Sequence, residues 1–159
     1  MQPFLPTLIL RHRKENLKKC SLRGLETKKD IQFLRYPTEK LPSLKGYILL
    51  SMEGEVLSKK DADQGILLLD GTWRYATKMH FFVTSHSASS DLVIRTLPKN
   101  LRTAYPRRQE DCLDPSRGLA SIEALAAAYA LLGREFLPLL DHYHWKNEFL
   151  NLNRDLLLC

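Results

Sequence analysis

The segment LLLDGTWRYATKM, residues 67–79, places residues that can bind a ligand at the point where an apolar run stops. Asp70 supplies a carboxylate at the end of the run, and Gly71 lacks a Cβ, so another group can approach the backbone closely. Open α/β sheets bind ligands at the carboxyl ends of their strands, so this pattern predicts a binding site at Asp70. The alternative is a strand, a turn and a helix without a ligand, in which Asp70 shapes the turn and Trp73 packs in the core.

Two groups of cations also indicate chemistry, because together they suit an anionic partner. The chain has a net charge of +6, and residues 11–23 hold six cations against one glutamate. These six are Arg11, Arg13, Lys14, Lys18, Lys19 and Arg23; a second group, in residues 98–109, consists of Lys99, Arg102, Arg107 and Arg108. The two groups favour phosphate binding, and a solvated surface is the alternative for each group alone.

Other common site signatures are missing from the sequence. Cys20, Cys112 and Cys159 are widely spaced and form no C-x-x-C pair, so neither a zinc site nor a disulfide framework is expected. A reducing, cytoplasmic setting is the prediction that follows. His142 and His144 are two residues apart and would point in different directions on a helix, which argues against a shared metal ion. There is no Gly-rich dinucleotide or nucleotide-triphosphate loop.

The expected secondary structure shows which elements must position these residues. Expected strands alternate with expected helices along the chain, and this pattern predicts an α/β fold. Strands are expected at residues 7–12, 44–52, 65–70 and 91–98, whereas residues 30–37 suit either a short strand or a helical turn. Helices are expected at residues 72–84 and 121–133, followed by one terminal helix with Pro138 in its first turn. Residues 65–70 are apolar up to Asp70, which is typical of a strand buried on both faces of a parallel sheet.

The helix ends and the long connection complete this expectation. Thr72 and Ser121 are expected to cap the N-termini of their helices, Glu123 to favour the second helix through its dipole, and Gly133 to end it. Residues 99–120 are polar and irregular, and a connection of this length is usually functional. The 159 residues suit one domain. No apolar run reaches the roughly 18–20 residues that a membrane span needs, so no membrane partner is expected.

Three blocks of the sequence together resemble the DTW family, which is named for its Asp-x-Thr-Trp motif. The blocks are LLLDGTWRYATKM, TLPKNLRTAYPRRQ and GLASIEALAAAYALLG, at residues 67–79, 96–109 and 118–133, and their order and spacing match as well as their letters. Upstream, RHRKENLKKCSLRGL is similar to the basic segment of the family's ribosomal-RNA branch. Together these blocks cover roughly half of the chain.

The resemblance implies a SPOUT-like α/β fold with a mostly parallel sheet, a C-terminal trefoil knot and bound S-adenosylmethionine. A basic, β-containing portion at residues 1–62 and a cofactor-binding portion at residues 63–159 would form a single domain. The implied reaction transfers the 3-amino-3-carboxypropyl group to N3 of a uridine or pseudouridine in structured RNA and releases methylthioadenosine. A cytoplasmic monomer without a metal ion is expected.

The same resemblance implies roles for individual residues. Asp70 would be the general base for uridine N3 or the electrostatic partner of the sulfonium, and Trp73 would pack against the methionine portion of the cofactor. Ser21 would contact the ribose of the cofactor. The adenine pocket would be lined, through backbone and side chain, by Leu69, Leu97, Leu119 and Ser121. Tyr105 would be available to stack on a base. The RNA backbone would be bound by Arg11, Arg13, Lys14, Lys18, Lys19, Arg74, Arg102, Arg107 and Arg108.

Departures from the family pattern leave the RNA substrate open. The transfer-RNA branch usually carries an N-terminal cysteine cluster, which this chain lacks, and the ribosomal branch usually has an Asn-Pro segment where this chain reads YPRRQEDCLDPSRG. Arg117 stands where an aromatic residue would be expected over the adenine. Two alternative functions remain: a methyltransferase that holds the same cofactor in another orientation, and a non-catalytic module for RNA binding or ribosome assembly.

Overall fold

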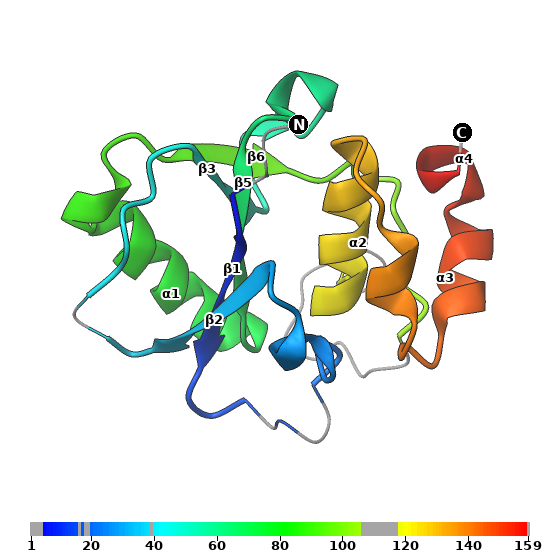
Figure 1. Cartoon of the computed structure of the whole chain (residues 1–159), viewed down its shortest axis with the longest axis horizontal. Helices are drawn as coiled ribbons and strands as arrows, with labels where there is room; N and C mark the ends of the chain where they lie inside the picture. The colour runs from blue at the N-terminus through cyan, green and yellow to red at the C-terminus, as the bar shows by residue number, and fades with distance from the viewer. Residues whose placement is uncertain (1–4, 16, 18–19, 39, 106–117, 159) are drawn as a thin grey trace.

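In the part of the chain that the structure describes, six strands form one sheet in which every neighbouring pair is parallel. The structure is a computed structural model that describes residues 5–15, 17, 20–38, 40–105 and 118–158, without the side chain of Trp73. The strands are β1 (Thr7–His12), β2 (Ile31–Tyr36), β3 (Tyr47–Ser51), β4 (Glu55–Val56), β5 (Gly65–Asp70) and β6 (Val93–Thr96), in the order β2-β1-β5-β3-β6-β4 (Figure 1). The predicted α/β class with a parallel sheet is confirmed.

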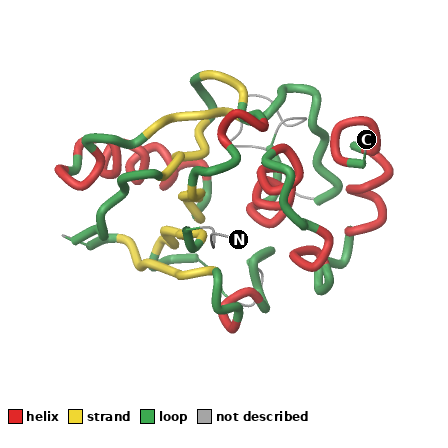
Figure 2. The backbone as a smooth tube through the Cα atoms, turned by 45° about the horizontal axis from the view of Figure 1, so that its top comes forward, coloured by secondary structure: helices red, strands yellow, loops and turns green. Residues whose placement is uncertain are grey.

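Helices lie on both faces of the sheet. Helix α1 (Trp73–Ser85) covers one face and α2 (Ser121–Leu131) the other, while α3 (Lys146–Leu152) and α4 (Arg154–Leu157) lie beyond α2 (Figures 1 and 2). Short 3-10 helices are η1 (Leu25–Thr27), η2 (Lys59–Asp61), η3 (Ser87–Ser89) and η5 (Leu137–Leu140). Within the described part of the chain, no helix combines the length and the apolar character that crossing a membrane requires.

The central strands are apolar along their length because each face of the sheet has its own core. In β5, Ile66 and Leu68 pack on the side of α2, whereas Leu67 packs on the side of α1 together with Met79 and Val83. Successive side chains of a strand point to opposite faces, so both sets are buried at once. Asp70 continues the Ile66–Leu68 set, and its side chain therefore lies on the α2 side of the sheet.

Two adjacent strands, β1 and β5, lead away from the sheet on opposite sides. After β1, the chain places Cys20, Leu22 and Leu25 in the core on the α2 side. After β5, it enters α1 on the other face. Such a point, where neighbouring connections diverge at the carboxyl ends of parallel strands, is where open α/β sheets form their ligand crevices. The topology therefore directs attention to the ends of β1 and β5.

Some sequence-based expectations about the elements are wrong. The single terminal helix is instead η5, α3 and α4, and the break between α3 and α4 falls at Asn153. The side-chain amide of this buried residue accepts a hydrogen bond from the Arg102 N–H and donates one to the Arg102 carbonyl. It also donates to the Phe149 carbonyl of α3, and so competes with the backbone N–H groups that would continue the helix. Ala120, rather than Ser121, is the N-cap of α2, and Thr72 is the N-cap of α1 without a capping side-chain hydrogen bond. Strand β4 was not expected, because two exposed residues carry no pattern.

Candidate functional site

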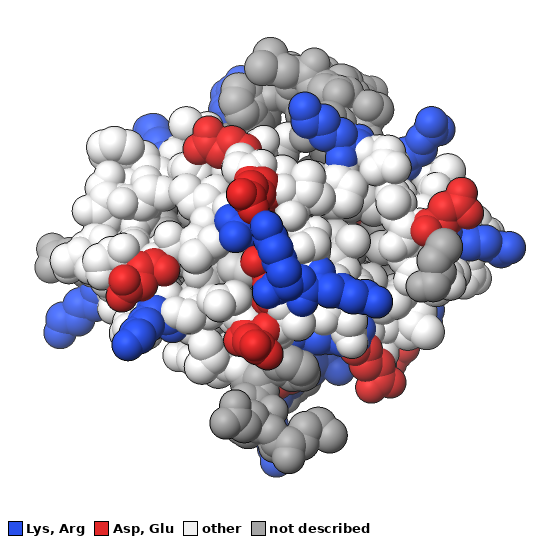
Figure 3. All heavy atoms as spheres, turned by 90° about the horizontal axis from the view of Figure 1, so that it is seen from above, with Lys and Arg blue, Asp and Glu red and all other residues white. Residues whose placement is uncertain are grey.

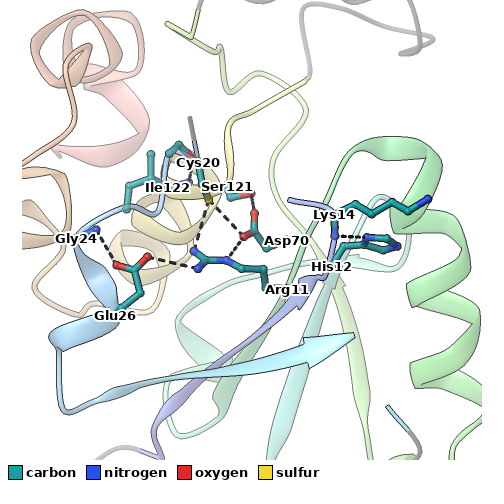
Figure 4. Close-up of polar contacts among 10 residues, drawn as sticks. Arg11, His12, Lys14, Cys20, Gly24, Glu26, Asp70, Ser121 and Ile122 are labelled. Atoms are coloured by element: carbon teal, nitrogen blue, oxygen red, sulfur yellow. Dashed lines mark hydrogen bonds and ion pairs between the residues drawn. The ribbon is translucent and has the colours of Figure 1, made fainter. Parts of the chain in front are cut away.

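Asp70 is the centre of a buried polar cluster at the carboxyl ends of β1 and β5 (Figure 4). Its side chain accepts a hydrogen bond from Ser121 Oγ at 2.9 Å on Oδ1, and from Arg11 Nε at 3.0 Å and Cys20 Sγ at 3.4 Å on Oδ2. Asp70 is only 1% exposed. We call Asp70, Arg11, Cys20 and Ser121 the Asp70 cluster.

Arg11 belongs to this cluster because of the strand register. It pairs with Asp70 across β1 and β5, so the two side chains lie on the same face of the sheet. The guanidinium also donates to Glu26 at 3.4 Å and lies 4.3 Å over the ring of Phe33. Burial alone would lower the pKa of Arg11, but the hydrogen bond to Asp70 and the negative charges nearby raise it above its ordinary value. Arg11 is therefore a fixed internal cation rather than one of the surface cations expected to bind RNA.

Cys20 and Glu15 complete the surroundings of the carboxylate. Burial and the charge of Asp70 raise the pKa of the Cys20 thiol to about 12, so the thiol stays neutral and can donate to Asp70. Burial and the same charge raise the pKa of Glu15, against the opposing effect of Arg11. One ligand atom each of Glu15, Cys20 and Asp70 lie within 4.8 Å of one another, as in a metal site. A metal-bound thiol must lose its proton, and Arg11 already occupies the carboxylate, so these donors suit a charge network better than a metal ion.

The neutral state of Cys20 leads to a first testable prediction. In a variant with Cys112 and Cys159 replaced by serine, native Cys20 should react with a thiol reagent at pH 8 at least about 100-fold more slowly than in urea, because the thiolate is the reacting species. Because folding favours the protonated thiol, its contribution to stability should be complete below pH 9 and be lost as the pH rises toward 12. Equal rates in the native and unfolded protein would contradict this environment for Cys20.

The residues expected to bind the cofactor are only partly brought together. Ser121 donates to Asp70, and Ser21 Oγ accepts from the N–H of Ile122 at 3.1 Å, so both serines lie at the N-terminus of α2. Leu97 and Leu119 are half-buried and pack against the core on the same side. Leu69 packs on the α1 side instead, so its side chain does not lie with the others. Trp73 begins α1, but its side chain lies outside the described part of the structure.

Gly71 is needed for a contact within the protein. A Cβ on this glycine would lie 3.3 Å from His12 Cβ and 3.3 Å from Met79 Sδ. The group that approaches the backbone here is therefore the end of β1 and the underside of α1 rather than a ligand. This close packing holds the start of α1 against the carboxyl ends of the two strands.

Glu123 has a larger role than the sequence analysis assigned to it. This residue of α2 is fully buried, and its Oε1 accepts from Thr103 Oγ1 at 2.6 Å and from the Ala120 N–H at 2.8 Å. Its Oε2 accepts from the Ala104 N–H at 2.8 Å. Glu123 thus joins the segment before residues 106–117 to the segment after them. An acidic residue three positions after a helix N-cap was the available signal, but its long-range partners were not predictable.

The cations expected to contact RNA differ in exposure, and several of them lie outside the described residues. Those with exposed side chains are Arg13, Lys14, Arg74 and Arg102. Those outside the described residues are Lys18, Lys19, Arg107 and Arg108. Figure 3 shows the molecule from the end at which β1 begins, and there Lys and Arg are interspersed with Asp and Glu. Among the described residues, the end opposite the Asp70 cluster therefore carries both signs of charge.

The comparisons with known proteins identify one similar structure. The chain matches no protein-family model, and no curated protein matches it significantly. Among solved structures, its fold is similar to that of the SAM-dependent rRNA:acp-transferase Tsr3 from Vulcanisaeta distributa, with a TM-score of 0.73. The match covers 98% of this chain and 82% of Tsr3 at 22% sequence identity. The two proteins thus share a fold.

Proposed function

We propose that this protein transfers the 3-amino-3-carboxypropyl group of S-adenosylmethionine to RNA. The observation that carries the proposal is the Asp70 cluster, in which a buried carboxylate is held by side chains from β1, from the segment after β1 and from α2. The cluster lies where neighbouring strand connections diverge, in a fold shared with a SAM-dependent rRNA:acp-transferase. The resemblance of residues 67–79, 96–109 and 118–133 to the DTW family points to the same reaction.

The residues around the cluster suit S-adenosylmethionine. Ser21 and Ser121 bring two hydroxyl groups to the N-terminus of α2, which can bind polar groups of a ribose. Leu97 and Leu119 present half-buried apolar surface on the same side, as the flat ring of adenine requires. The negative charge of Asp70, which is shared with Arg11, would act on a cationic sulfonium through space rather than by direct contact. When bound, the cofactor would supply an electrophilic carbon next to its sulfur.

For Asp70, the geometry favours the electrostatic role over that of a general base. Both carboxylate oxygens accept hydrogen bonds, and the side chain is 1% exposed, so a nucleobase proton does not reach it in this arrangement. Arg11 holds one carboxylate oxygen and Ser121 the other, which fixes the orientation of the group. A preorganised charge of this kind would bind and orient the sulfonium, with little reorganisation of the protein during the reaction.

The finer features belong to the same proposal. The nucleophile would be N3 of a uridine or pseudouridine: a carbon–nitrogen bond forms, the carbon–sulfur bond breaks, methylthioadenosine leaves, and the N3 proton passes to a base. The substrate would be small-subunit ribosomal RNA or transfer RNA, of which the Tsr3 likeness supports the former. The chain would be a SPOUT-class protein with a C-terminal knot, acting in the cytoplasm as a monomer without a metal ion.

Label transfer tests this function directly. The protein is incubated with small-subunit ribosomal RNA, or with transfer RNA, and with S-adenosylmethionine labelled either in the carboxypropyl chain or in the methyl group. We expect chain label in the RNA and release of methylthioadenosine. Methyl label in the RNA with release of S-adenosylhomocysteine would assign the protein to the methyltransferases, and the absence of cofactor binding would favour an RNA-binding module.

A further inference from the structure

A shallow groove of about 710 Å³ runs along the outer side of α1, away from the Asp70 cluster. Its lining includes Tyr36 at the end of β2 and Lys78, Phe81, Phe82 and His86 on and after α1. The side chain of Phe81 is unusual for a surface helix, because the residue is 72% exposed. No aspartate or glutamate stands among the described residues that line the hollow. We call this hollow the α1 groove.

A row of aromatic rings joins the α1 groove to the carboxyl end of β1. Tyr75 stacks on His12 with 3.9 Å between ring centroids and an interplanar angle of 11°. His12 lies 5.4 Å from Tyr36, and Tyr36 lies 5.4 Å from Phe82, which in turn lies 5.6 Å from His86. His12 directly follows Arg11 on β1 and points to the other face of the sheet, so the row begins one residue away from the Asp70 cluster.

Cations accompany this row of rings. The Lys14 Nζ lies 5.9 Å from the centroid of the Tyr75 ring, and Lys78 lines the groove itself. Burial lowers the pKa of His12, and the positive charges of Lys14, Arg13 and Lys78 lower it further. The positive potential of three cations is therefore felt at His12, where the row begins. Next to this row, Phe81 offers an exposed ring on which a base can stack, and Lys78 and Lys14 are cations that can meet phosphates. An exposed aromatic ring beside cations is a feature of surfaces that bind single-stranded nucleic acid.

We propose that the α1 groove binds unpaired nucleotides of the RNA that the protein modifies. Bases would stack on Phe81 and on neighbouring rings, while Lys78, Lys14 and Arg13 would lie along the phosphates. A strand bound there would pass over the carboxyl ends of β1 and β5, where the reaction is proposed to take place. This inference rests on the proposed function for the identity of the RNA. An apolar protein segment would fill the groove without using the cations, so the charges favour RNA.

Binding measured without cofactor tests the inference. The probes are a fluorescein-labelled single-stranded decauridylate and a fully paired RNA duplex, compared at the same concentration of phosphates. Binding is followed by fluorescence anisotropy at several salt concentrations. Phe81→Ser should weaken binding of the single strand about tenfold, because it removes the ring on which a base stacks. It should leave the salt dependence unchanged, because stacking involves no phosphate. The slope of log affinity against log salt concentration is negative. Lys78→Gln should reduce its magnitude by about 0.7, because one phosphate contact is lost.

Matched controls come from the far side of the molecule. Leu152→Ser removes an exposed apolar side chain of α3, and Lys59→Gln removes an exposed cation of η2; neither should change binding. The inference would be overturned if Phe81→Ser bound the single strand as tightly as Leu152→Ser does. It would also be overturned if the wild-type protein showed no measurable binding of the single strand. Self-association of the wild type that Phe81→Ser abolishes, without a change in RNA affinity, would assign the groove to a second copy of the chain.

The outcomes separate this inference from the proposed function. If Phe81→Ser transfers carboxypropyl label with the wild-type rate and the wild-type KM for RNA, the α1 groove does not bind the substrate RNA, while the proposed function stands. If neither the wild type nor any variant transfers label, but Phe81→Ser weakens binding of the single strand, RNA binding at the α1 groove stands and the proposed function fails.

Discussion

Asp70→Asn should lower the free energy of unfolding by about 3 kcal/mol and reduce aminocarboxypropyl transfer at least about 100-fold. The substitution keeps the shape of the side chain but removes the charge that pairs with Arg11, whose side chain is only 12% exposed. Removing one partner of a buried ion pair leaves the other charge without compensation, and this cost is much larger than that of losing a surface pair. Urea unfolding and the label-transfer assay give the two values.

Glu26→Gln is the matched control for Asp70→Asn. Glu26 pairs with the same guanidinium, but its side chain is 41% exposed, so its loss should cost no more than about 1 kcal/mol. A double variant, Asp70→Asn with Arg11→Met, should be less destabilised than the sum of the two single variants, because neither buried charge is left alone. Equal effects of Asp70→Asn and Glu26→Gln on stability would contradict a central role for the Asp70–Arg11 pair.

Glu123→Ala should be about as destabilising as the loss of Asp70, at roughly 3–5 kcal/mol. The substitution leaves the buried Ala120 N–H and the half-buried Ala104 N–H and Thr103 hydroxyl without their acceptor. Each unsatisfied buried donor costs about 1–3 kcal/mol. Transfer activity should fall as well, because Glu123 connects the two segments that flank residues 106–117. The urea midpoint and hydrogen exchange at the Ala104 and Ala120 amides provide the measurement.

The conservative variant keeps this prediction testable if Glu123→Ala does not fold. Glu123→Gln retains one acceptor oxygen and turns an NH₂ group toward at least one former donor. The free energy of unfolding of this variant should therefore lie between those of the wild type and Glu123→Ala. Glu135→Ala, an exposed acidic residue just after α2, should change stability by no more than about 0.5 kcal/mol. A small effect of both Glu123 variants would mean that the two segments are held together by other contacts.

Several parts of the fold follow from local pattern alone. β5 was predicted with its observed bounds because six residues, apolar up to Asp70, are long enough for a strand and too short for a helix. The start of α1 after Gly71 was also predictable, whereas the choice between strand and helical turn for residues 30–37 was not. Pairing with β1 along Ile31–Tyr36 decides in favour of a strand, and such pairing is a property of the whole sheet.

The site shows the same division between local and tertiary information. Asp70 was singled out because its strand ends there, and Ser21 and Ser121 entered through the family resemblance. Nothing local distinguished Arg11 from the surface cations Arg13 and Lys14, since all three stand in one basic run. The residues 106–117, with Arg107, Arg108 and Arg117, lie outside the described structure, so their expected roles stay predictions.

By itself, then, the sequence determined the class of fold, the positions of the central strands and Asp70 as the centre of the candidate site, because periodicity and strand ends are local properties. Tertiary structure alone decided which residues surround that carboxylate. The parallel register of β1 against β5 places Arg11 beside Asp70 and sends His12 to the opposite face, toward Tyr75 and the α1 groove. A shift of that register by one residue would exchange the two side chains, and no local signal encodes it.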